Sequence, residues 1–90
     1  MKVLIVDDEP PARDRLRDLL NRLSDYEPCG EAGNGVEALR LAASVQPDIV
    51  LLDIQMPGLD GLETARQLTE LAHPPAIIFV TAYGDHALAA

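Results

Sequence analysis

Three short apolar runs, uninterrupted by polar residues, constrain the fold of this chain more than any other feature. They cover residues 3–6, 49–52 and 76–80. Continuous apolar runs of this length are typical of strands that are covered on both faces, as in a parallel sheet. The segments between them have helical patterns, so the sequence predicts strands and helices in alternation.

The first helix is expected to begin near Pro10, because proline suits the first turn of a helix. Its apolar residues recur at the spacing of one helical stripe. They are Ala12, Leu16, Leu19, Leu20 and Leu23. The arginines between 13 and 22 lie off this stripe, interleaved with Asp14 and Asp18, and we interpret them as a solvated face with local ion pairs.

Two further helices have N-terminal capping signals. Asn34 is followed three residues later by Glu37, and Asp60 is followed in the same way by Glu63. This spacing is typical of a capping box, in which both residues bond backbone N–H groups of the first turn. We expect the helix after Asn34 to end before Pro47 and the helix after Asp60 to end near residue 72.

One predicted strand, residues 26–32, is weak. It contains Pro28 and Gly30, and proline cannot donate to a hydrogen-bonded ladder, so this strand belongs at a sheet edge. The element order then alternates along the chain. Such alternation predicts an α/β fold, an open parallel sheet with helices on both faces.

Acidic residues follow two of the predicted strands directly. Asp7 and Asp8 end the first strand, Asp53 ends the third, and Thr81 follows the fourth. Ligands of such sheets bind at the carboxyl ends of the strands, and neighbouring strands are roughly 4.8 Å apart. Carboxylates held that close repel one another unless a cation lies among them, and Mg²⁺ prefers oxygen ligands. The sequence therefore predicts a metal site that handles phosphate.

The segment after Asp53, DIQMPGLDG, supports this interpretation. Pro57 and Gly58 predict a turn that shapes the loop beside Asp53. That loop could direct the backbone carbonyl of Gln55 at the metal.

Composition and charge exclude several other functions. The formal net charge is −8, whereas nucleic-acid binding requires a basic surface and anionic membranes attract one. No uncharged run is long enough to span a bilayer, and acids interrupt the N-terminal apolar run too early for a signal peptide. The lone Cys29, interpreted as a small filler residue, fits a reducing compartment, so a cytoplasmic location is expected.

The motifs VDDEP at 6–10, LLDIQMPGLDG at 51–61 and VTAYGD at 80–85 together resemble the receiver domain of two-component response regulators. The segments DDEPPARDRL and TAYGDHAL are most similar to LytTR-type regulators, whose receivers precede a DNA-binding domain. The resemblance covers essentially the whole chain. It implies a flavodoxin-like sheet and a phosphoacceptor module that is not an enzyme.

The resemblance also assigns roles to individual residues. Asp53 matches the phosphoacceptor, which takes a phosphoryl group from a histidine kinase. Asp8 matches a direct Mg²⁺ ligand, Asp7 a ligand acting through water, and the carbonyl of Gln55 a further ligand. Two more residues match the switch region. Thr81 matches the hydroxyl that turns toward the phosphoryl group, and the small Ala82 leaves access to it.

The sequence also departs from the family pattern. The family's sheet has the order 2-1-3-4-5, with a lysine at the end of the fifth strand, whereas Lys2 is the sole lysine here. We therefore expect residues 1–90 to form one receiver domain, truncated before its fifth strand and helix, with strand order 2-1-3-4. Residues 76–80 would then form an exposed apolar edge, which favours a homodimer or a segment-swapped oligomer.

Three other interpretations remain open at this point. A metal-binding pseudo-receiver, never phosphorylated because its lysine is missing, would keep the same acids. A metal-dependent phosphatase with an aspartyl nucleophile would also share them. A dinucleotide-binding domain is suggested by GNGVEA at 33–38, which fits G-x-G-x-x-A, although the strand before it is the weakest of the chain.

Overall fold

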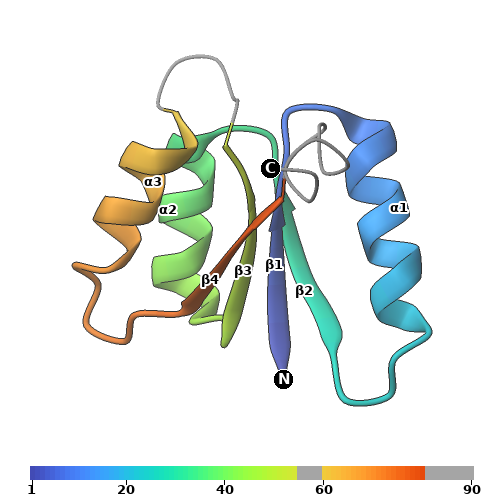
Figure 1. Ribbon diagram of the computed structural model, residues 1–90. Helices are drawn as coiled ribbons and strands as arrows, with labels where there is room; N and C mark the ends of the chain where they lie inside the picture. The colour runs from blue at the N-terminus through green and yellow to red at the C-terminus, as the bar shows by residue number, and fades with distance from the viewer. Residues whose placement is uncertain (55–59, 81–90) are drawn as a thin grey trace, which may run out of the picture.

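The computed structural model describes residues 1–54 and 60–80 of the chain. Four parallel strands form one sheet in the order β2-β1-β3-β4 (Figure 1). Their bounds are Lys2–Val6 for β1, Glu27–Ala32 for β2, Ile49–Asp53 for β3 and Ala76–Val80 for β4. The predicted strand order is confirmed, and each of the three apolar runs is a strand.

In the described part of the chain, three helices cover the two faces of this sheet. The helix α1 (Pro10–Asn21) lies on one face, whereas α2 (Gly35–Val45) and α3 (Gly61–Leu68) lie side by side on the other (Figure 1). This three-layer arrangement is the predicted α/β fold of the flavodoxin-like type.

The central strand β1 contributes to both hydrophobic cores because its side chains alternate between the two faces. Leu4 and Val6 pack into the core under α2 and α3, whereas Val3 and Ile5 pack into the core under α1. All four side chains are buried. This explains why the run lacks polar alternation, since neither face of β1 meets water.

The strand β2 lies at the edge of the sheet, as Pro28 predicts. It pairs with β1, and the register shifts between Val3 and Leu4, whose partners are Pro28 and Gly30. Cys29 is the extra residue of this bulge. Because β2 lies at the edge of the sheet, the missing N–H donor of Pro28 costs least there.

The N-cap half of both capping-box predictions is confirmed, whereas the carboxylate of Glu63 bonds the guanidinium of Arg66. The side chain of Asn34 accepts a hydrogen bond from the backbone N–H of Glu37 at 2.8 Å, and that of Asp60 accepts one from the N–H of Glu63 at 2.7 Å. The helix α3 ends at Leu68, earlier than the predicted end near residue 72. The hydroxyl of Thr69 donates to the carbonyl of Arg66, and the chain continues in turns.

The predicted apolar stripe of α1 is partly wrong. Leu20 is buried and Leu16 packs beside it, but Leu19 and Leu23 are about half exposed. The helix α1 contacts mainly β1 and β2, and no other described helix lies beside it on the same face above β3 and β4 (Figure 1). An apolar groove remains there, lined by residues that include Leu20, Leu23 and Ile78.

The strand β4 forms the second edge of the sheet among the described residues. It pairs with β3, and its Ile78 and Phe79 side chains are 50% and 42% exposed. No helix in residues 1–54 and 60–80 has both the length and the apolar character needed to cross a membrane.

Candidate metal and phosphoacceptor site

The candidate site lies where β1 and β3 end side by side. These strands are parallel neighbours, with Val6 paired to Leu52. Asp7 and Asp53 come directly after this pair in the two strands, so the register places them at the same level of the sheet. Asp8 extends the same edge by one residue. The predicted convergence of the two acidic segments therefore follows from the register of two central strands.

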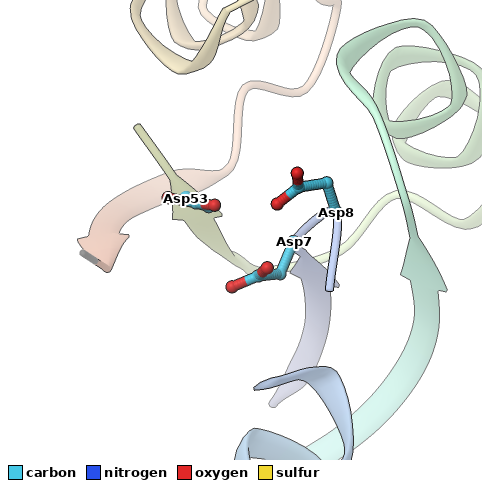
Figure 2. Close-up of side chains that lie close together, drawn as sticks. All are labelled: Asp7, Asp8 and Asp53. Atoms are coloured by element: carbon cyan, nitrogen blue, oxygen red, sulfur yellow. The ribbon is translucent and has the colours of Figure 1, made fainter. Parts of the chain in front are cut away.

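One carboxylate oxygen from each of Asp7, Asp8 and Asp53 lies within 4.8 Å of those of the other two. Figure 2 shows the carboxylates of Asp8 and Asp53 directed toward each other, with that of Asp7 beside them. Asp7 and Asp53 are 8% and 9% exposed, whereas Asp8 is exposed. Two of the three charges are thus largely shielded from water, which strengthens their mutual repulsion.

Asp7 is held by hydrogen bonds on three of its groups. Its backbone N–H donates to the carbonyl of Ala32 at 3.1 Å, and its carboxylate accepts from the N–H of Glu9 at 2.9 Å. Its carbonyl accepts from Nη1 of Arg13 at 2.6 Å. The turn after β1 is therefore held by a bond to β2, by a bond within the turn and by a bond from α1.

Gly61 fixes the approach of α3 to the end of β3. Its N–H donates to the carbonyl of Ile54 at 3.0 Å. A Cβ at Gly61 would lie 2.4 Å from the carbonyl oxygen of Asp53 and 2.5 Å from Cα of Ile54. Only a residue without a side chain allows the helix to begin this close to Asp53. In the sequence, Gly61 is an ordinary glycine after a helix cap and carries no sign of this requirement.

A group of ion pairs joins α1 to β2 beside the site. Arg13 and Arg17 each bond one oxygen of Glu31, at 3.3 and 2.9 Å, and Arg17 also pairs with Asp14. The hydrogen bond with Glu31 is the main cause of the raised pKa of Arg17. The local pair of Arg17 with Asp14 agrees with the expected solvated face. The contacts with Glu31 were not predicted, because helix periodicity carries no information about the neighbouring strand.

Several predicted site residues lie outside the described residues. They are Gln55, Pro57, Gly58, Thr81 and Ala82. Lys2 lies at the opposite end of β1 from the acids, where its ammonium donates to the carbonyl of Val45 at 2.8 Å. Cys29 is partly buried in the bulge, and desolvation raises the pKa of its thiol, in keeping with a filler residue.

The glycines of the dinucleotide motif do not occupy the position that a dinucleotide site requires. The motif follows β2, an edge strand, and not the first strand of the fold. Its Asn34 side chain caps α2 and bonds the backbone N–H of Glu37. The helix N-terminus that would bind a pyrophosphate is therefore partly satisfied by the protein itself.

The donor set at the acidic site fits Mg²⁺. It consists of carboxylate oxygens alone, and Mg²⁺ is bound in proteins by one or two carboxylates together with water and phosphate oxygens. A divalent cation bound at this site would offset the repulsion among the three carboxylates.

An open parallel sheet with helices on both faces and acidic side chains at the carboxyl ends of its central strands defines an α/β domain of the kind that binds ligands at this edge. The sequence matches the family described as "Response regulator receiver domain" over residues 3–90. The chain belongs to this family, whose members are signalling modules of two-component systems.

Similar regulators occur in several bacteria. The chain is 58% identical over 93 residues to the positive alginate biosynthesis regulatory protein of Pseudomonas aeruginosa. It is 47% identical to the transcriptional regulatory protein BtsR of Escherichia coli and 48% identical to the sensory transduction protein LytT of Bacillus cereus, over 90 residues each. All of this chain is covered, but it spans 37% of the length of these relatives.

Solved structures agree on the fold. The response regulator domain of Thermotoga maritima CheB matches with a TM-score of 0.85 at 32% identity, covering 99% of this chain and 71% of that one. A chain of the complex from Borrelia burgdorferi described as CheX-CheY-BeF3-Mg+2 matches with a TM-score of 0.84 at 29% identity. That match covers 98% of this chain and 66% of the other.

Proposed function

We propose that Asp53 is the phosphoacceptor of this receiver domain. The observation that carries the proposal is the convergence of Asp53 with Asp7 and Asp8 at the carboxyl ends of two neighbouring strands. A carboxylate can act as a nucleophile and form an aspartyl phosphate. The donor we propose is a phosphohistidine of a histidine kinase.

Asp8 and Asp53 would hold Mg²⁺ directly, and Asp7 would act through water. When bound, Mg²⁺ supplies charge neutralisation for the transferring phosphoryl group. Asp53 contributes the attacking oxygen: a P–O bond forms to its carboxylate as the P–N bond to the donor imidazole breaks. The imidazole leaves with the electron pair of that bond and takes up a proton.

The proposal extends to residues outside the described part of the chain. Gln55 would offer its carbonyl to the metal, Pro57 and Gly58 would shape that loop, and Thr81 with Ala82 would contact the phosphoryl group. Phosphorylation would then shift a two-state arrangement that controls dimerisation or an output domain. We propose a cytoplasmic, non-enzymatic module without direct contact to nucleic acid or membrane, whose DNA-binding output lies elsewhere.

Thermal unfolding with Mg²⁺ and beryllofluoride, a phosphoryl mimic, tests the phosphoacceptor role. A ligand that binds only the folded state adds about 2.7 kcal/mol to the free energy of unfolding at 100 times its Kd, and so raises the unfolding midpoint. For a domain of this size that corresponds to roughly 10–20 °C. We expect the rise from beryllofluoride in the unaltered chain and its loss in Asp53→Ala.

The alternative of a metal-binding pseudo-receiver gives a different result in the same experiment. Within residues 1–90 the sole lysine, Lys2, lies at the opposite end of β1 from the acids, and this is the observation behind the second candidate. A response to Mg²⁺ without any further response to beryllofluoride would support it and contradict phosphorylation of Asp53. No response to either ligand from a cooperatively folded chain would contradict both candidates.

We also propose that this 90-residue chain self-associates through β4. Among the described residues β4 pairs with β3 alone and exposes Ile78 and Phe79, and strand edges of this kind accept further strands. Light scattering coupled to size exclusion should show a mass above that of the 9.7 kDa monomer. Ile78→Lys should shift the mass toward the monomer, and a compact monomer of the unaltered chain would contradict the proposal.

A further inference from the structure

Arg13 links the acidic site to two neighbouring elements of the fold. It lies in the second turn of α1, and its guanidinium reaches across to the end of β1. Its Nη1 donates to the carbonyl oxygen of Asp7 at 2.6 Å, while its Nε pairs with Glu31 of β2 at 3.3 Å. One planar group thus connects a helix, the turn carrying two of the acids and a neighbouring strand.

The carbonyl that Arg13 holds belongs to the peptide between Asp7 and Asp8. Because a peptide unit is planar, fixing its oxygen fixes the orientation of the whole unit. The N–H of Asp7 is bonded to Ala32 of β2, and its carboxylate accepts from Glu9. The bond from Arg13 completes this set, so the direction in which Asp8 leaves the backbone depends on it.

Glu31 holds the guanidinium in the orientation that this bond requires. One carboxylate oxygen of Glu31 faces Arg13 and the other faces Arg17. A Cβ at Gly33 would lie 3.4 Å from Nη1 of Arg13, so the guanidinium also packs against the backbone after β2. Because Glu31 balances its charge, Arg13 acts on the site through geometry more than through its positive charge.

We propose that Arg13 is a positioning residue that orients the Asp7–Asp8 peptide for Mg²⁺ binding. The inference rests on the proposed function, since it takes the acidic cluster to be the metal site. Residues that orient metal ligands typically contribute about 10- to 100-fold to metal affinity. Because Arg13 bonds the peptide that joins two of the proposed ligands, Asp7 and Asp8, we expect a loss of this order when it is removed.

The test compares Arg13→Met with Arg17→Met. Both substitutions remove a guanidinium that bonds Glu31, but Arg17 bonds Asp14 where Arg13 bonds the carbonyl of Asp7. Mg²⁺ alone is titrated by calorimetry into each folded variant, and its unfolding midpoint is measured without metal. We expect the Kd for Mg²⁺ to rise about 10-fold in Arg13→Met and less than two-fold in Arg17→Met.

Arg13→Lys gives a second, milder variant in case Arg13→Met does not fold. Lysine keeps the charge and can donate to Asp7, but it lacks the planar fork that bonds Glu31 at the same time. We expect a Kd between those of the unaltered chain and Arg13→Met. A Kd equal to that of the unaltered chain in Arg13→Lys would show that the fork shared between Asp7 and Glu31 is not needed, and would contradict positioning by the guanidinium.

A merely structural role for Arg13 would lower the metal-free midpoint and leave the Kd of the folded protein unchanged. That result, or equal weakening by Arg17→Met, would overturn this inference while leaving the metal site intact. Failure of the unaltered chain to bind Mg²⁺ would instead overturn the proposed function, and this inference with it.

Discussion

Replacement of Gly61 by alanine is expected to lower the free energy of unfolding by about 3 kcal/mol or more, at the upper end of what overpacking costs. The new Cβ would lie 2.4 Å from the carbonyl oxygen of Asp53 and 2.8 Å from that of Ile54. Both atoms are backbone, so no rotation of a side chain can relieve the overlap. The helix α3 must move away from β3, and Asp53 must shift with it.

Urea unfolding of Gly61→Ala measures this loss, and Gly30→Ala is its matched control. At Gly30 the nearest atom to a new Cβ is the end of the Leu4 side chain, at 3.4 Å, which can adjust. We expect the control to change stability by less than about 1 kcal/mol. Equal effects from the two substitutions would show that the approach of α3 to Asp53 does not constrain residue 61.

Asp8→Asn is expected to have opposite effects on the metal-free and the metal-bound protein. Without metal, removal of one charge relieves its repulsion with Asp7 and Asp53, worth on the order of 1 kcal/mol at this separation in water. The unfolding midpoint should therefore rise by roughly 4–8 °C. The Kd for Mg²⁺ should rise at least about 10-fold, because a carboxylate ligand has become a weaker amide.

Thermal unfolding at several Mg²⁺ concentrations tests both effects of Asp8→Asn. Asp18→Asn is the control, since it removes the same charge from an exposed position on α1. It should leave both the midpoint and the Kd nearly unchanged. A lower metal-free midpoint in Asp8→Asn would show that the three carboxylates do not repel one another in the folded chain.

The sequence predicts the sheet well because β1, β3 and β4 are continuous apolar runs. Pro28 correctly predicts that β2 lies at an edge. The acidic site follows from the same pattern, since Asp7 and Asp53 directly follow two of these runs and parallel strands end together. Strand ends are a local property of the sequence, so the convergence of the acids could be predicted without coordinates.

Contacts between elements were not predictable in the same way. The stripe on α1 correctly identified Leu20, but the exposure of Leu19 depends on how the helix lies on the sheet and on what packs beside it. The bond of Arg13 to Asp7 depends on how α1 is rotated about its axis. Gly61 resembles any glycine after a helix cap, and the need for it appears only when the distance to β3 is known.

The strand order has a consequence for synthesis of the chain. The central strand β1 is made before β3, and α1, β2 and α2 are all made between these two neighbours. Until β3 is made, the strand of residues 3–6 can pair along one edge only, with β2. The acidic cluster cannot assemble on a shorter nascent chain, so the ability to bind Mg²⁺ would report that the centre of the sheet has closed.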